Sequence, residues 1–391
     1  MNPNPAIGVL YHWLGGLASG SFYVPYRGVK GWAWETFWLA GGFFSWIIAP
    51  WFLAGLLTKD IFAVLHEAPT SSLFWACFFG LLWGVGGLTF GLTMRFLGLS
   101  LGMAMVLGLC AAFGTLMPPI FSGEFMSHVV GTTSGRVILL GIFVCLVGIA
   151  VAGLAGISKE RNMSTAEKQA VIKEFDLKKG TGVAILSGVM SACFAYGLAA
   201  GDPIKVLTLK HGTPVLWQGL PVLIVVLVGG FTTNFIWCLW LNFRNHSGYQ
   251  YFSTKPGQMG NSADTLETAI DAPSREMVEH APSRVAVLEK NTPTQRVPML
   301  RNYLLCALAG TTWYFQFFFY TMGETQMGQY KFSSWTLHMA SIIIFSSLWG
   351  IGLKEWKGAG KTAGGLLALA LVLLVGSTVI VGYGNYLGLV H

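Results

Sequence analysis

The fold class is decided by the stretch Arg136-Val-Ile-Leu-Leu-Gly-Ile-Phe-Val-Cys-Leu-Val-Gly-Ile-Ala-Val-Ala-Gly-Leu-Ala-Gly-Ile157. After Arg136 this stretch carries no charged side chain, and one helix of this length crosses a hydrocarbon core about 30 Å thick. The whole chain has a similar composition, because 53% of its 391 residues are hydrophobic and only 10% are charged. Soluble domains have about 25% charged residues. The sequence therefore predicts an all-α integral membrane protein and excludes a large soluble domain.

Other apolar runs of roughly 20 residues occur along the chain, and each is long enough to span a membrane. Together they predict ten transmembrane helices, at 6–26, 34–57, 71–96, 98–121, 136–157, 181–200, 214–241, 302–321, 332–353 and 362–387. No Lys or Arg precedes the first run. We therefore expect this run to stay in the protein as a helix and not to be removed as a signal peptide.

The distribution of Lys and Arg predicts the orientation, because short loops rich in these residues stay in the cytoplasm. Of the 24 Lys and Arg residues, all but a few fall in the odd-numbered connections between spans. The exceptions are Lys59, Arg136, Lys205, Lys210 and Lys331. Both termini are therefore predicted to face the periplasm. Attraction to the anionic cytoplasmic leaflet accounts for the net charge of +7, so no nucleic-acid partner is needed.

Two polar segments interrupt the apolar pattern. The first, 158–180, is charged, contains an expected helix at 165–174, and separates a half at 1–157 from a half at 181–391. Five spans in each half give the halves opposite orientations, as in transporters built from inverted repeats. The second segment, 243–298, mixes Ser, Pro, Gly, Asp and Glu, and is predicted to be a long flexible cytoplasmic loop.

The sequence gives no sign of a metal site, a cofactor or a catalytic nucleophile. The six cysteines lie in apolar stretches without a Cys-x-x-Cys pair, at Cys77, Cys110, Cys145, Cys193, Cys238 and Cys306. Such cysteines are expected to be inert core thiols. No motif of a zinc hydrolase or of a serine hydrolase occurs, which argues against an enzyme.

Ionisable side chains within spans are costly and are therefore candidates for function. His338, a turn or two into the ninth span, is the stronger proton candidate, because imidazole exchanges protons near physiological pH. His12, in the first span, fits a transport role or a hydrogen bond between helices. Glu35 opens the second span, where it fits a proton-carrying role or a carboxylate that stabilises the first turn of the helix.

Gln316 is the most informative neutral residue, because aromatic side chains flank its amide in Trp313-Tyr-Phe-Gln316-Phe-Phe-Phe-Tyr320. Sugars need in-plane hydrogen bonds and an apolar ring face, and this segment offers both. Trp313 and Tyr320 are spaced to share the side of the helix that carries Gln316. Asn234 is a similar candidate in the seventh span. The alternative for these residues is a plain interhelical hydrogen bond.

Two carboxylates, Asp202 and Glu324, fall at the outer ends of spans. We expect both to be solvated caps of their helices.

Several motifs combine Trp, His, Gln and Arg in a fixed order. They are Phe22-Tyr-Val-Pro25, Ser45-Trp-Ile-Ile-Ala-Pro-Trp51, Gly91-Leu-Thr-Met-Arg-Phe-Leu-Gly98, the segment from Trp313 to Tyr320, Trp335-Thr-Leu-His338 and Lys354-Glu-Trp356. Through them the sequence resembles the bacterial L-rhamnose/proton symporter family of the drug/metabolite transporter superfamily, nearly from end to end. This resemblance implies two inverted five-helix halves around a central sugar site. It also implies uptake of a 6-deoxyhexose, L-rhamnose foremost, driven by the proton gradient across a bacterial inner membrane.

The sequence departs from the family pattern at a few polar positions. The family usually carries asparagine where this chain has Gly87, and asparagine and lysine where it has Ala199 and Asp202. A related sugar therefore also fits the sequence. Other readings stay open: a transporter or exchanger of another metabolite, a sugar-binding membrane sensor that signals through 243–298, or a protein whose buried polar groups only join helices.

Overall fold

The computed structural model describes residues 3–97, 99–161, 176–254 and 296–390, and within these ranges the chain forms helices and no strand. The all-α prediction is therefore confirmed for the described residues. Eight helical segments are long and apolar enough to span a membrane: Trp34–Leu57, Thr70–Met94, Leu101–Phe121, Thr133–Arg161, Leu177–Lys210, Val215–Arg244, Gly328–Gly352 and Gly360–Val390. They match eight of the ten predicted spans. The other two predicted spans are helical, as α1 (Pro5–Ser21) and α14 (Met299–Glu324), but are not among the eight.

The remaining helices follow in chain order. They are α2 (Tyr23–Tyr26), α3 (Trp34–Phe43), the π-helix η1 (Phe44–Ile48), α4 (Ala49–Leu57), α5 (Ile61–Glu67), α6 (Thr70–Leu97), α7 (Leu99–Phe121), the π-helix η2 (Phe125–Val130), α8 (Thr133–Arg161), α10 (Leu177–Ala200), α11 (Asp202–Lys210), η3 (Val215–Trp217), α12 (Leu220–Arg244), η4 (Gly248–Tyr251), η5 (Gly328–Ser333), α15 (Ser334–Gly352) and α16 (Gly360–Val390).

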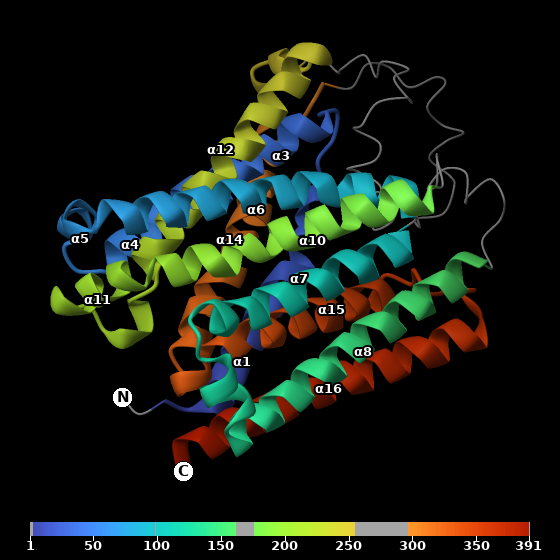
Figure 1. The fold of residues 1–391 in the computed structure, drawn as a ribbon. Coiled ribbons are helices and arrows are strands. Elements are labelled where there is room, and N and C mark those ends of the chain that lie inside the picture. The colour runs from blue at the N-terminus through green and yellow to red at the C-terminus, as the bar shows by residue number, and fades with distance from the viewer. Residues whose placement is uncertain (1–2, 98, 162–175, 255–295, 391) are drawn as a thin grey trace.

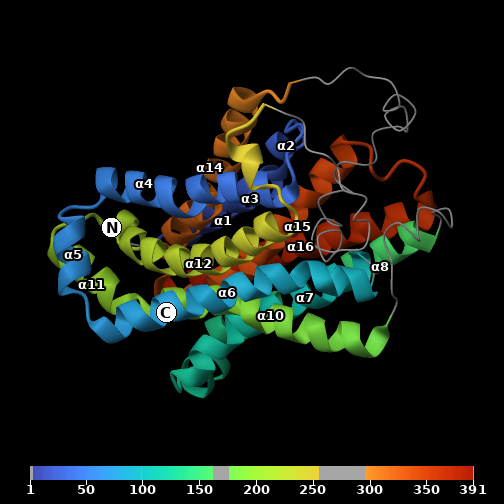
Figure 2. The same cartoon turned by 90° about the horizontal axis from the view of Figure 1, so that it is seen from above.

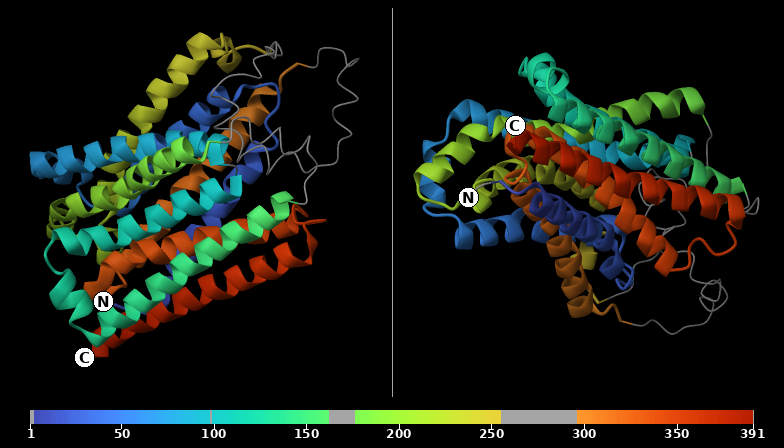
Figure 3. Two further views of the ribbon diagram at one scale, coloured as in Figure 1. Left: turned by 45° about the vertical axis from the view of Figure 1, so that its right-hand side comes forward. Right: turned by 90° about the horizontal axis from the view of Figure 1, so that it is seen from below.

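The long helices form a bundle whose two ends differ (Figure 1). Both chain termini lie at one end together with the short helices α5 and α11, and Figures 2 and 3 show the same grouping from other sides. We call this end the terminal end. Helix α8 ends and α10 begins at the opposite end. The spans thus place the short connections α5 and α11 on the side of the termini.

The packing of the long helices follows a simple scheme. Helix α1 packs against α14 and α15, α10 packs against α6 and α7, and α8 packs along α16. Small residues allow these close approaches. A Cβ added at Gly16 would lie 2.3 Å from Ser341 Oγ, and one added at Gly86 of α6 would lie 2.5 Å from the backbone nitrogen of Ser191 in α10. The first of these contacts draws the polar residues of α1 and α15 together.

The beginning of the segment expected to be a loop at 243–298 is ordered against α3. Helix η4 follows the end of α12, and the Gln250 side-chain oxygen accepts hydrogen bonds from the Ala33 amide at 2.6 Å and the Thr36 hydroxyl at 3.0 Å. The rest of this segment, 255–295, and the helix expected at 165–174 lie outside the described residues. The packed part joins the start of the second span to the end of the seventh.

Candidate functional site

One face of α14 carries three of the predicted site residues. Trp313, Gln316 and Tyr320 are spaced by three and four positions, which places them on one side of a helix. The Tyr320 ring meets His12 of α1 and His338 of α15 edge to face, with ring centroids 5.3 Å apart in both cases. These three side chains are buried. We call His12, Tyr320 and His338 the histidine cluster, which brings together residues predicted separately from the sequence.

Two glycines make room for this arrangement. A Cβ at Gly323 would lie 2.7 Å from His12 Nε2, so any side chain there would displace the imidazole. A Cβ at Gly15 would lie 2.9 Å from the carbonyl oxygen of Gln316 and 3.5 Å from His338 Nδ1. Because both positions lack a side chain, α1 approaches α14 and α15 closely enough for the imidazoles to share the Tyr320 ring.

The polar atoms of this region are largely unpartnered. Both ring nitrogens of His12, Nδ1 of His338 and the side-chain nitrogen of Gln316 are buried and make no hydrogen bond within the described part of the chain. Buried polar groups are normally paired, and leaving one unpaired costs about 1–3 kcal/mol. A role limited to joining helices would require hydrogen bonds from these atoms. The arrangement instead favours a ligand or a proton as their partner.

Trp313 and Asn234 belong to a second group of residues. Trp313 lies about one turn before Gln316 in α14, whereas Tyr320 lies about one turn after it. Trp313 stacks on Phe22 at 4.6 Å and contacts Trp38 at 5.0 Å and Trp46 at 5.3 Å between ring centroids. We call these four residues the aromatic box. Asn234 of α12 is held at its edge, because its side-chain oxygen accepts a hydrogen bond of 3.2 Å from Trp38 Nε1. The box offers apolar ring faces about two helical turns from Tyr320 along α14.

Glu35 lies apart from the histidine cluster. Its side chain is fully buried in the first turn of α3, where one carboxylate oxygen accepts hydrogen bonds from the Ser247 hydroxyl and, at 3.3 Å, from the Asn245 amide. The other oxygen, Oε2, has no partner within the described ranges. Glu35 thus ties α3 to the end of α12, whereas the histidines join α1, α14 and α15.

The prediction that Glu324 is a solvated cap is wrong. Its side chain is 14% exposed and its carboxylate lies 2.8 Å from Lys205 Nζ. Lys205 is itself 8% exposed and pairs with Asp202 at 3.0 Å, and Asp202 also pairs with Lys331 at 2.7 Å. The chain turns after Gly201 into α11, which carries Lys205 to the end of α14. The spacing of Asp202 and Lys205 was the available sequence signal, since residues three apart on a helix can pair.

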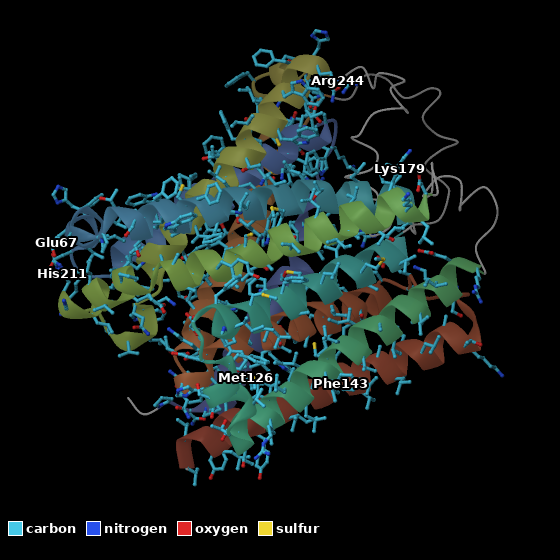
Figure 4. The ribbon with its side chains drawn as sticks, in the orientation of Figure 1. Glu67, Met126, Phe143, Lys179, His211 and Arg244 are labelled. Atoms are coloured by element: carbon cyan, nitrogen blue, oxygen red, sulfur yellow. The ribbon has the colours of Figure 1, made fainter. Side chains whose placement is uncertain are left out.

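A further pair joins α5 to α11 at the terminal end, where Figure 4 shows Glu67 and His211 side by side. His211 Nε2 lies 3.1 Å from the Glu67 carboxylate, and Nδ1 lies 3.7 Å from Asp60. The hydrogen bond to Glu67 raises the pKa of His211 above its ordinary value. This pair connects the first and second halves of the chain outside the spans.

Comparison with known proteins gives a consistent result. The family described as L-rhamnose-proton symport protein (RhaT) matches residues 1–256 and 285–386. Proteins named L-rhamnose-proton symporter from Cronobacter sakazakii, Salmonella gallinarum and Salmonella newport are each 34% identical over 379 residues, which is 97% of this chain and 97% of each relative. The match covers α1, α14 and α15, the helices that hold the histidine cluster.

Proposed function

The chain belongs to the L-rhamnose-proton symport protein (RhaT) family, and on that premise we propose that it takes up L-rhamnose together with a proton across a bacterial inner membrane. The observation that carries the proposal is the histidine cluster, in which two buried imidazoles share one tyrosine ring and leave ring nitrogens without partners. This arrangement suits a transporter, because the site offers hydrogen-bonding and titratable groups at which a sugar and a proton can bind.

The two imidazoles of the cluster suit the handling of a proton. A histidine gains and loses a proton in the physiological range more readily than any other side chain. Two positive charges against one tyrosine ring, away from water, would repel, so we propose that His12 and His338 are not protonated at the same time. Glu35 remains a proposed proton-carrying residue separate from this pair, and its unpartnered oxygen supports that role.

The sugar is proposed to lie along the face of α14 between the cluster and the aromatic box. Gln316 and Asn234 supply amides, and Trp313 and Tyr320 supply rings on which an apolar sugar face packs. Binding next to the imidazoles couples sugar to proton. Among the proposed proton carriers, Glu35 is the one that protonation makes neutral, and a neutral group crosses a region of low dielectric at lower cost than a charged one.

The proposed topology is ten transmembrane helices in two inverted five-helix halves, 1–157 and 181–391, with both termini in the periplasm. The eight apolar spans together with α1 and α14 supply the ten. In an inverted repeat each span of one half corresponds to the span five places along in the other half. The contacts of α1 with α14 and α15 (spans 1, 8 and 9) then correspond to those of α10 with α6 and α7 (spans 6, 3 and 4). That equivalence supports inverted repeats and placement in the drug/metabolite transporter superfamily.

Purified protein in liposomes tests the proposed function. Adding L-rhamnose outside proteoliposomes is expected to make the external medium more alkaline, because each sugar that enters carries a proton with it. A protonophore should abolish sugar accumulation, and protein-free liposomes should show neither effect. If the protein accumulates L-rhamnose without any proton uptake, the proposal of symport is wrong.

A further inference from the structure

The π-helical turn η1 interrupts the second span between α3 and α4, and it carries buried polar atoms. Within η1 the Ser45 hydroxyl and the Trp46 indole Nε1 are buried and have no hydrogen-bond partner in the described ranges. Single π-turns of this kind occur frequently at functional sites. Burying an unpaired donor costs about 1–3 kcal/mol. Trp32 and other tryptophans also have a buried Nε1 without a partner in the described ranges, and what distinguishes Trp46 is its contact with Trp313 of the candidate site.

Glycines fix the orientation of the Trp46 ring. A Cβ at Gly42, one turn earlier, would lie 2.7 Å from Trp46 Cζ3 and 2.9 Å from Cε3. The benzene edge of the indole therefore packs against Gly42, and the edge that carries the N–H lies on the other side of the ring. A Cβ at Gly310 would lie 2.1 Å from the carbonyl oxygen of Gly41, so α14 crosses the second span at this level. The crossing brings Trp313 to Trp46.

The surroundings of Trp46 are aromatic on several sides. Its ring centroid lies 5.3 Å from that of Trp313, 6.2 Å from Trp38, 6.2 Å from Phe231 and 6.4 Å from Trp83. These four neighbours are partly exposed, whereas Trp46 is only 1% exposed. Trp46 thus places one polar N–H within a set of apolar rings. Ligand pockets commonly combine such apolar walls with a few placed polar groups.

We propose that Trp46 is a sugar-binding residue of the transport site, whose indole N–H donates a hydrogen bond to one hydroxyl of L-rhamnose while the rings of the aromatic box pack on the apolar face of the sugar. The inference rests on the proposed function and names a contact within it. The indole N–H can only donate a hydrogen bond, so it binds a sugar oxygen and is left without a partner where that oxygen is missing. A site built around such a donor rejects an analogue that lacks the matching hydroxyl, because the N–H is then left unpaired.

Binding of L-rhamnose to the purified protein, followed by calorimetric titration, tests this contact. Trp46→Phe keeps an aromatic ring and removes the N–H, and we expect affinity to fall about tenfold. Trp32→Phe is the matched control, because Trp32 is also buried with an unpartnered Nε1 but packs on Tyr303, 4.8 Å between centroids. Its affinity should match that of the wild type. A lowered affinity in both variants would overturn the proposal.

Deoxy analogues of L-rhamnose identify the hydroxyl and separate recognition from general packing. We expect the wild type to bind one of the 2-, 3- and 4-deoxy analogues about tenfold more weakly than L-rhamnose, and Trp46→Phe to bind that analogue and L-rhamnose alike. Equal binding of all three analogues and L-rhamnose by the wild type overturns the proposal without any variant. So does a Trp46→Phe protein that discriminates among the analogues as the wild type does.

Gly42→Ala provides a second variant, because it displaces the ring and keeps the indole. The same selective loss is expected, and this variant decides the question if Trp46→Phe does not fold. If the wild type binds L-rhamnose and takes up protons with it while both variants behave as the wild type, only the Trp46 contact is wrong. If the wild type does not bind L-rhamnose, the proposed function falls together with this contact.

Discussion

Two helix interfaces of similar build differ in how their polar groups are satisfied. Helix α10 packs against α6 and α7, and there the Ser187 hydroxyl donates to the Gly86 carbonyl at 2.9 Å and the Tyr196 hydroxyl to the Phe113 carbonyl at 3.0 Å. Helix α1 packs against α14 and α15 in the same manner. In this second interface the imidazole nitrogens of His12 remain unpartnered within the described chain.

The difference concerns buried polar side chains, His12, His338 and Gln316 among them, and not the quality of the packing. The Ser341 hydroxyl of α15 lies 2.9 Å from the carbonyl oxygen of His12 and 2.8 Å from that of His338, so the backbone near both histidines is held as firmly as that near Ser187. The imidazoles are left open, and so is the side-chain nitrogen of Gln316. Paired polar groups stabilise a fold, whereas unpaired buried ones in a well-packed interface call for an explanation, and for these imidazoles we propose a proton or a ligand as the partner.

Removing an imidazole should have the largest effect. In His338→Gln and His12→Gln we expect sugar-dependent proton uptake into proteoliposomes to be abolished, because glutamine fills similar space but does not titrate. Ser187→Ala is the matched control. It should keep full transport and lose about 1 kcal/mol of stability with its hydrogen bond. Sustained accumulation of L-rhamnose by both histidine variants would show that the two interfaces do not differ in function.

The sequence predicts the spans well where their composition is uniform, and less well where the site lies. The two predicted spans outside the eight apolar ones are α1 and α14. Helix α1 is only 17 residues long, and α14 contains Arg301, Asn302, Gln316 and Glu324. The polar residues that make α14 a candidate for function are the same ones that lower its hydropathy. The two weaker spans therefore carry His12, Trp313, Gln316 and Tyr320 of the proposed site, whereas His338 lies in an apolar span, α15.

The contacts of the site depend on long-range packing that no local pattern contains. The helical spacing of Trp313, Gln316 and Tyr320 predicts a shared face, which the structure has. The approach of His12 to His338 depends on the order in which α1, α14 and α15 pack, because the two residues lie in the first and ninth spans. Trp46 belongs to a motif that carries the family resemblance, but the sequence gives it no role, since a tryptophan within an apolar run resembles an ordinary core residue.

Breaking the ion pair at the end of α14 tests whether the charged side chains there stabilise the fold. Lys205→Met leaves the Glu324 carboxylate without its close partner, and we expect a loss of about 3–5 kcal/mol in the free energy of unfolding. Adding Glu324→Gln should restore most of that loss, because the uncompensated charge is removed. Denaturant unfolding of purified protein measures both changes. A stable Lys205→Met single variant would show that this ion pair adds nothing to the fold.

Crowding the imidazole of His12 should have a smaller effect. In Gly323→Ala the new methyl carbon would lie 2.7 Å from His12 Nε2 if nothing moved. We therefore expect a destabilisation of about 1–3 kcal/mol and reduced proton uptake. Gly182→Ala of α10 is the control, because a Cβ there meets no atom within 4 Å. Its stability should be unchanged or raised by up to about 1 kcal/mol. Equal behaviour of the two variants would mean that the α1 interface tolerates displacement of its histidine.

The smallest expected effect is the pH dependence of the pair between α5 and α11. Because the hydrogen bond to Glu67 raises the pKa of His211 above its ordinary value of 6.5, the folded state binds the proton more tightly than the unfolded state. The stabilisation is fully present below pH 6.5 and is lost as pH rises through the raised pKa. Exposed ion pairs contribute little, so the shift in the thermal midpoint should be modest.

His211→Gln and Glu67→Gln should each reduce this pH dependence between about pH 5.5 and about pH 8.5, since either change removes the charge-assisted hydrogen bond. Both variants should still take up protons with L-rhamnose, because the pair lies outside the spans and away from the histidine cluster. Thermal unfolding at the two pH values measures the first expectation, and the proteoliposome assay measures the second. Loss of proton coupling in His211→Gln would instead show that a titratable group at the terminal end takes part in transport. The difference between the α1 and α10 interfaces would then no longer explain the coupling.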